Sequence, residues 1–236
     1  DLILLHQPLA DYYGAYRALE DLYAEGKVKA IGVSNFYPDR LTDICMFDRK
    51  VIPAVNQVEV NPYNAQWCAQ ENMEKHGVKM EAWAPFGEGR NNLFTNETLV
   101  SIGKKYNKSS AQVMLRWLIQ RGVIVACKST HIERMQENIN VFDFELTEED
   151  MNSIKTLDTS NSLFFSHNDP NMVEWFDKIV KERRVKKEIA VTQAQNPDNP
   201  KPAAPKVTKI SAKRKTATTA EVVLQSDKSG TMSLYC

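Results

Sequence analysis

Polar side chains that could do chemistry recur at the ends of short apolar runs in this 236-residue chain. His6 and the pair Ser34-Asn35 each follow one such run, Trp83 closes another, and Gln57 lies inside a further one. If these runs are parallel strands, their carboxyl ends meet at one rim, where ligands bind in barrels and open parallel sheets. A hydroxyl and two amides suit a planar carboxamide such as that of nicotinamide, and an indole beside them offers a stacking surface.

Each of these residues also has a purely structural interpretation. A histidine after a strand is more often a hydrogen-bonded structural residue than a catalyst, Ser34-Asn35 could cap the next helix, and the indole could belong to the core. The run that holds Gln57 also carries Asn56 and Glu59, and a buried amide needs partners, of which a ligand amide is one. The shared rim favours a functional role, because it brings the whole group together.

A candidate anion site follows the apolar run Val123–Ala126. A helix is predicted after Thr130, which could cap it, so free backbone N–H groups meet an ammonium and a guanidinium suited to a phosphate monoester. Two side chains about one turn further on could hydrogen-bond an adenine amino group. The alternative is an ordinary capped surface helix with solvated charges. The candidate ligands are Lys128, Ser129, Thr130, Arg134, Glu137 and Asn138.

The elements that must position these groups alternate short apolar runs with amphipathic segments. The runs start 28, 24, 24 and 45 residues apart, close to the length of a strand plus a crossover helix. This alternation predicts an α/β fold with five parallel strands and right-handed connections. The predicted strands are Leu2–Leu5, Ala30–Val33, Ala54–Val58, Val78–Trp83 and Val123–Ala126.

Helix boundaries are indicated by three glycines that each precede a run. Gly26, Gly77 and Gly122 are expected at left-handed C-caps. The longest interval between strands predicts a loop over residues 86–95, which is a candidate for covering a ligand, and two helices over 97–106 and 109–121.

The zero net charge of the chain conceals two different parts. Residues 1–176 hold 17 Lys/Arg against 24 Asp/Glu, and residues 177–236 hold 13 against 6. The second part is Lys-, Thr- and Ser-rich, with a polyproline-like linker over 196–205, and is expected to be a disordered basic extension. Its charge could attract nucleic acid or anionic lipid, but a single aromatic residue, Tyr235, makes specific binding an unfavoured interpretation.

Composition excludes several classes of protein. The average composition, with 42% hydrophobic and 25% charged residues, is that of a globular protein. The apolar runs are far too short to span a bilayer, so no membrane role is expected. The four cysteines have no paired spacing, which argues against a disulfide framework or a zinc site and predicts a cytoplasmic protein.

The ordered motifs of residues 1–176 resemble the aldo/keto reductase family. A Trp at position 83 and the segment 162–176 resemble its bacterial-type branch, which includes diketogluconate reductases. The resemblance rests on Asp1-Leu-Ile-Leu-Leu-His6-Gln-Pro8, Gly26-Lys-Val-Lys-Ala-Ile-Gly-Val-Ser-Asn35, Asn56-Gln57-Val-Glu-Val-Asn-Pro62, Lys128-Ser with Arg134, Glu137 and Asn138, and Phe142-Asp-Phe-Glu-Leu146.

This resemblance implies a TIM-type (β/α)8 barrel that uses NADPH to reduce a small-molecule aldehyde or ketone, with no obligate protein partner. His6 matches the catalytic histidine that orients the substrate carbonyl. Trp83 matches the aromatic residue stacked on nicotinamide, and Phe86 with Gly87 lie where a loop approaches the pyrophosphate. By the same comparison Ser34, Asn35 and Gln57 match the carboxamide ligands, and the matches around the 2′-phosphate and adenine are Lys128, Ser129, Arg134, Glu137 and Asn138.

Two departures from the family pattern affect these expectations. The residue before the phosphate-site lysine is often proline in the family and is Cys127 here. The family's first three strands, with its catalytic aspartate, its tyrosine acid and the partner lysine, precede the position that matches Asp1. The chain is therefore expected to hold strands four to eight of an incomplete barrel, to be inactive alone, and to be poorly soluble because both sheet edges are open.

Three hypotheses about function follow. The chain is part of an NADPH-dependent carbonyl reductase, a non-catalytic nucleotide-binding or regulatory barrel protein, or a protein that interacts through its basic tail.

Overall fold

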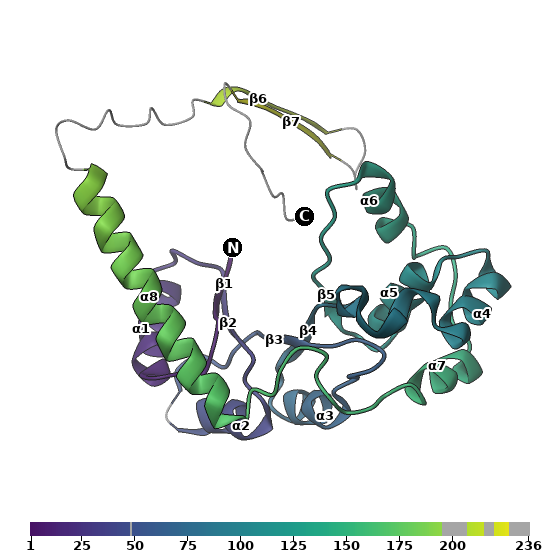
Figure 1. Cartoon of the computed structure of the whole chain (residues 1–236), viewed down its shortest axis with the longest axis horizontal. Coiled ribbons are helices and arrows are strands. Elements are labelled where there is room, and N and C mark those ends of the chain that lie inside the picture. The colour runs from purple at the N-terminus through teal and green to yellow at the C-terminus, as the bar shows by residue number, and fades with distance from the viewer. Residues whose placement is uncertain (48, 195–206, 215–219, 227–236) are drawn as a thin grey trace. The chain divides into compact units, whose positions relative to one another are not determined.

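A row of five parallel strands forms the framework of residues Asp1–Trp175, the first of two compact units (Figure 1). The computed structural model describes residues 1–47, 49–194, 207–214 and 220–226. The strands pair in chain order, each with the next, which confirms the predicted parallel sheet. They are β1 (Leu2–Leu5), β2 (Ala30–Ser34), β3 (Val55–Glu59), β4 (Lys79–Trp83) and β5 (Ile124–Val125).

Helices connect the strands and lie along the outer side of the curved row (Figure 1). The predicted loop over 86–95 contains a 3-10 segment, η1 (Gly87–Thr95), and the two helices expected after it are present. The helices of this unit are α1 (Tyr12–Ala24), α2 (Pro38–Met46), α3 (Trp67–Lys75), α4 (Glu97–Tyr106), α5 (Ser110–Gln120), α6 (Ile132–Ile139) and α7 (Glu148–Lys155).

Three glycines set the direction in which the chain leaves a helix for the next strand. Gly26, Gly77 and Gly122 have φ angles of 70°, 72° and 73°, as predicted for left-handed C-caps. Residues with a side chain are disfavoured at such angles, so glycine allows the chain to turn sharply between the end of each helix and the next strand.

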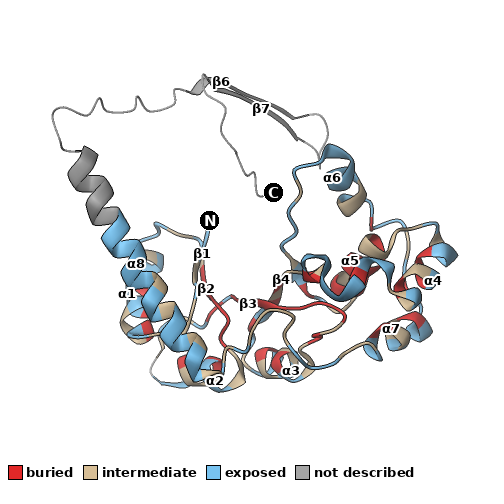
Figure 2. Cartoon of the chain, viewed as in Figure 1, coloured by how far each residue is buried: buried red, intermediate tan, exposed pale blue. Residues whose placement is uncertain are grey.

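The core lies between the strands and their helices, as the buried segments of β2 and β3 in Figure 2 indicate. On β4 the pleat places Met80 and Ala82 in this core and points Glu81 and Trp83 to the opposite face. The alternation of apolar and polar residues along β4 therefore reflects two faces with different roles. The inner face of the row is where the candidate site residues are found.

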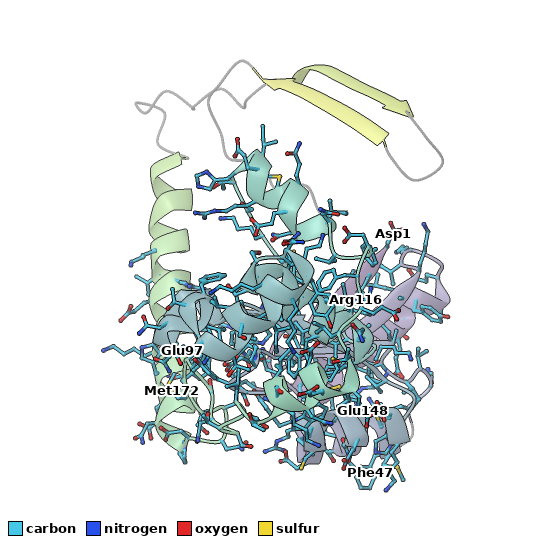
Figure 3. The ribbon with its side chains drawn as sticks, turned by 90° about the vertical axis from the view of Figure 1, so that its right-hand side faces the viewer. Asp1, Phe47, Glu97, Arg116, Glu148 and Met172 are labelled. Carbon is cyan, nitrogen blue, oxygen red and sulfur yellow. The ribbon has the colours of Figure 1, made fainter. Side chains whose placement is uncertain are left out.

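Helix α5 is buried along most of its length and holds the chain that follows α6. Arg116, labelled in Figure 3, donates to the Val141 carbonyl at 3.3 Å and to Glu145 at 3.0 Å. Gln120 donates to the Leu146 carbonyl at 3.0 Å. These bonds fix the connection from α6 to α7 against the core.

The second unit, Phe176–Cys236, contains a helix and two strands within the residues that the structure describes. Helix α8 (Pro170–Ala194) continues into it, and β6 (Val207–Arg214) pairs antiparallel with β7 (Ala220–Ser226). The register of this pair places Ile210 opposite Leu224. The linker predicted over 196–205 lies outside the described residues.

Within the part of the chain that the structure describes, no helix is long and apolar enough to cross a membrane.

A buried carboxylate joins α4 to α7. Asp150 is 1% exposed and accepts hydrogen bonds from Lys105 Nζ at 2.6 Å and Tyr106 OH at 2.5 Å. It also forms a capping box with Thr147 at the start of α7. Burial raises the pKa of this carboxyl, but the hydrogen bonds from Lys105, Tyr106 and Thr147 together outweigh burial, so its pKa is lowered overall.

Replacing this carboxylate should therefore destabilise the unit. We expect Asp150→Ala to lower the free energy of unfolding by about 1–3 kcal/mol, because a cap and charge-assisted hydrogen bonds are lost. The measurement is urea unfolding. Glu149→Ala removes an exposed acidic residue from the same helical turn and should change stability by less than about 0.5 kcal/mol. Equal effects of the two substitutions would contradict the assigned role.

Candidate functional site

The Asn35 carboxamide joins the carboxyl ends of three strands. Its Nδ2 donates to the His6 carbonyl and to Ser34 Oγ, both at 3.1 Å, and Trp83 Nε1 donates to its Oδ1 at 2.9 Å. Its backbone N–H donates to the Gln57 carbonyl at 2.9 Å. Asn35 has a φ of 61°, a left-handed conformation that asparagine tolerates better than most residues. The structure thus brings five of the predicted site residues together.

The two other candidate carboxamide ligands are partly engaged within the protein. Ser34 Oγ donates to the Gln57 carbonyl at 2.8 Å, and Gln57 Nε2 donates to Glu81 Oε1 at 2.8 Å. Gln57 and Glu81 are register partners on β3 and β4, so their side chains share the inner face. Gln57 Oε1 accepts no hydrogen bond from the described residues, which leaves an acceptor on this face.

The neighbouring polar residues of β3 have structural partners. Asn56 is buried, donates to the Phe36 carbonyl at 2.6 Å and accepts from the Phe36 N–H at 3.3 Å. Glu59 is also buried and accepts from Ser162 Oγ and the Leu163 N–H. Neither side chain has a ligand-facing role in this arrangement, whereas Gln57, between them on the strand, is partly exposed.

The indole of Trp83 is held at two points. In addition to the bond to Asn35, its ring packs against the Phe164 ring with centroids 5.0 Å apart and planes at 60°. Phe164 belongs to a segment far away in the sequence, and no periodicity before it indicated this contact. The side chain of His6, at the end of β1, is exposed at the same rim.

The candidate anion residues line one pocket of about 520 Å³. Neither Lys128 nor Arg134 forms an ion pair or hydrogen bond within the described ranges, so both cations are available to a ligand. Ser129 Oγ accepts from the His131 N–H at 3.1 Å. The pocket is lined by Phe86, Glu88, Phe94, Ser109, Ser110, Ala111, Lys128, Ser129, Thr130, His131, Arg134, Glu137 and Asn138.

Thr130 does not cap the helix, contrary to the sequence interpretation. Helix α6 begins at Ile132, and its N-cap position is His131, which makes no side-chain capping bond. The His131 N–H donates to Ser129 Oγ, and the helix begins one residue later than predicted. Thr130 lines the pocket instead.

The two candidate adenine contacts are partly engaged. Glu137 accepts a hydrogen bond from Ser109 Oγ, and Asn138 Nδ2 lies 3.8 Å from Cys127 Sγ. The sequence interpretation missed Ser109 and His131 as pocket residues. A signal for Ser109 was present, because Ser109 and Gln112 form a capping box that marks the start of α5.

Phe86 and Gly87 connect the pocket to the strand ends. Phe86 lines the pocket three residues after Trp83, and Gly87 is buried with a φ of 54°. A Cβ on Gly87 would lie 2.6 Å from Leu163 Cδ1, so this position admits only glycine without a shift of its neighbour.

Two tyrosines near His6 are unsuited to act as acids. Tyr12 OH donates to Asp43 Oδ2 at 2.6 Å and accepts from Arg40 at 3.3 Å. Burial and the bond to Asp43 raise the pKa of Tyr12, and a hydrogen bond to Asp43 raises the pKa of Tyr13 to about 12. Neither hydroxyl has a lysine partner among the described residues. A proton donor needs a pKa lowered toward neutrality, which is the opposite arrangement.

A second histidine, which the sequence did not single out, lies near the rim. The ring of His167 packs between Phe165 at 4.5 Å and Tyr37 at 5.2 Å, and neither ring nitrogen has a hydrogen-bond partner within the described ranges. Burial, with a smaller repulsion from His6, lowers the pKa of His167 to about 4.

The neutral state of His167 makes stability depend on pH. Between pH 6.5 and pH 4 the unfolded chain takes up a proton at this position and the folded chain does not, so the free energy of unfolding falls as pH falls. We expect His167→Leu to reduce the loss between pH 7 and pH 5 by about 1 kcal/mol, allowing for partial solvent screening. Urea unfolding at both pH values measures it. His131→Leu should keep the wild-type slope, and an unchanged slope in His167→Leu would contradict the prediction.

Comparison with known proteins confirms the family that the motifs resemble. Residues 1–159 match the Aldo/keto reductase family model. The chain is 45% identical over 158 residues to glyoxal reductase of Bacillus subtilis and 46% identical over 159 residues to 9,11-endoperoxide prostaglandin H2 reductase of Trypanosoma cruzi. Each alignment covers 66% of this chain and 56% of the relative, so the chain spans little more than half of their length.

Solved structures agree with this assignment. An aldo-keto reductase from a Medee basin deep-sea metagenome library matches with a TM-score of 0.68 and 41% identity, over 72% of this chain and 63% of that one. An aldo-keto reductase of Bombyx mori in complex with NADP matches with a TM-score of 0.65 and 32% identity, over 70% and 59%. The parallel sheet therefore corresponds to part of the barrel of these enzymes, and the chain belongs to the aldo/keto reductase family.

Proposed function

We propose that this chain forms the NADP(H)-binding end of an active site that reduces an aldehyde or ketone. The observation that carries this proposal is the pocket that contains two cations, Lys128 and Arg134, without internal partners among the described residues. Phe86, three residues after Trp83 in the sequence, lines the same pocket. A site for NADP(H) needs an anion-binding group at one end, for the 2′-phosphate, and a ring-binding surface at the other, for the nicotinamide.

The anion end suits the 2′-phosphate and adenine of NADP(H). Arg134 offers a planar guanidinium for two phosphate oxygens, and Lys128 adds a point charge. The amide of Asn138 and the carboxylate of Glu137 stand on the same helix, one turn further on, where an adenine amino group would find acceptors. Thr130 and Ser129 add hydroxyl groups on the pocket wall.

The strand ends suit the nicotinamide. Gln57 Oε1 and the second lone pair of Asn35 Oδ1 are acceptors for a carboxamide NH2, and Ser34 Oγ lies beside them. The Trp83 indole, held at two points, offers a preformed surface for the ring. Phe86 and Gly87 lie along the path between the two ends, where the pyrophosphate would pass.

A bound NADPH would supply a hydride to the carbonyl carbon in such a site. His6, exposed at the rim, orients the carbonyl oxygen through a ring N–H. Tyr12 and Tyr13 do not serve as the proton donor, because their pKa values are raised and no lysine of the described ranges is bonded to either. Because neither tyrosine is suited to donate a proton, a second candidate function is nucleotide binding without turnover.

The Arg134 side chain should make the chain bind NADPH more tightly than NADH. We expect Arg134→Ala to weaken NADPH binding roughly 10- to 100-fold, because a charge-assisted bidentate contact of about 1.5–3 kcal/mol is lost. NADH, which has no 2′-phosphate, should bind with unchanged affinity. Titration followed by the fluorescence of the reduced dinucleotide measures both. Lys79→Ala, at the opposite end of β4, is the control and should have no effect. Equal weakening of NADPH and NADH would contradict the proposed phosphate site.

Binding and turnover should separate in this chain. We expect the 236-residue chain to bind NADPH yet to oxidise it no faster with glyoxal or another reactive aldehyde than without, because the pKa values of Tyr12 and Tyr13 are raised rather than lowered. The measurement is the fall in NADPH absorbance with and without aldehyde. Oxidation at a rate comparable with that of an intact reductase would show that another group of the chain supplies the proton.

A further inference from the structure

A buried carboxylate without a cation lies directly behind the rim. Glu59, the last residue of β3, is 0% exposed and forms no salt bridge in the part of the chain that the structure describes. Its oxygens accept hydrogen bonds from Ser162 Oγ at 2.5 Å, from the Leu163 N–H at 3.0 Å and from Asn61 Nδ2 at 3.1 Å. A buried polar group needs hydrogen-bond partners, and here three neutral donors supply them.

These bonds organise a turn that is remote in the sequence. Ser162 Oγ donates to Glu59 and accepts from the N–H groups of Phe164 at 3.0 Å and Phe165 at 3.1 Å. With the Leu163 N–H bonded to the carboxylate, three successive backbone donors converge on Glu59 and the hydroxyl that it binds. The turn Ser162–Phe165 is therefore tied to the end of β3 across 103 residues of sequence.

The turn in turn contacts the candidate cofactor surface. Phe164 packs on the Trp83 indole. Arg90 lies over the Phe164 ring, with its guanidinium carbon 4.2 Å from the ring centroid. Arg90 also donates to the Leu163 carbonyl at 2.8 Å. The Leu163 side chain fills the space that a Cβ on Gly87 would need. Displacement of this turn would thus release one of the two contacts that fix the indole.

We propose that Glu59 is a positioning residue, which holds the turn Ser162–Phe165 so that Phe164 fixes the plane of the Trp83 indole for a bound dinucleotide. The inference deepens the proposed function and rests on it for the role of the indole. It does not place Glu59 in contact with the cofactor or substrate.

The choice of a carboxylate has a chemical reason. All three groups around Glu59 are donors, and an ionised carboxylate is an acceptor at every lone pair. A glutamine of the same shape would turn an NH2 toward the Ser162 hydroxyl or the Leu163 N–H, so at least one bond would be lost. An apolar residue would leave all three donors unsatisfied. The role is therefore specific to glutamate rather than to the volume of the side chain.

The test follows each indole separately. The chain has four tryptophans, and incorporation of 5-fluorotryptophan gives each a ¹⁹F resonance, that of Trp83 being assigned with Trp83→Phe. We expect Glu59→Gln to shift or broaden the Trp83 resonance and to leave those of Trp67 and Trp117 in place. Amide exchange at Leu163–Phe165 should accelerate at least tenfold, and NADPH affinity should fall about fivefold. Glu71→Gln, an exposed change on α3, is the matched control and should alter none of these.

Ser162→Ala provides a second route to the same answer. It removes the hydroxyl that joins the turn to Glu59, so it tests the arrangement even if Glu59→Gln fails to fold, and it should give the same shift of the Trp83 resonance. The inference would be overturned if both variants kept the wild-type Trp83 resonance and the wild-type amide exchange. If Glu59→Gln does not fold, the same result in Ser162→Ala alone would overturn it. Failure of the proposed function is distinct, because NADPH would then move no resonance of the wild-type chain, while the response of Trp83 to these substitutions still decides the role of Glu59.

Discussion

The structure of the candidate site depends on one carboxamide. Asn35 binds the end of β1 through the His6 carbonyl, the end of β3 through its backbone N–H, and the end of β4 through the Trp83 indole. A buried amide must satisfy its donors and acceptor, and Asn35 does so from a left-handed backbone conformation with a φ of 61°. The rim is therefore preorganised by hydrogen bonds between strands rather than by the loops that follow them.

A second level of organisation comes from segments remote in the sequence. Two buried polar side chains of β3 bind backbone groups of other segments, as Glu59 does with Leu163 and Asn56 does with Phe36. The bonds of Glu59 hold the turn whose Phe164 ring packs on the indole. Separately, Lys128 and Arg134 line the charged pocket without an internal partner in the described part of the chain. Cations that the protein does not neutralise itself are the groups best able to bind an anion.

Much of the framework could be predicted from the sequence because local rules govern it. The apolar runs give the strands to within one or two residues, and the glycines before them adopt the expected left-handed conformation. Thr130 was wrongly predicted as a cap, because a side-chain bridge from Ser129 to His131 shifts the helix start by one residue.

The sequence by itself determined the order of elements, the parallel sheet, the family and the identity of the polar residues at the rim, because each depends on periodicity or on short motifs. Only the tertiary structure decided which of those groups remain available. Gln57 binds Glu81, Glu137 binds Ser109, and the cations of the pocket bind nothing within the described ranges. The physical reason is that hydrogen-bond partners are set by proximity in space, and Glu59 meets Ser162 across 103 residues that no local pattern connects.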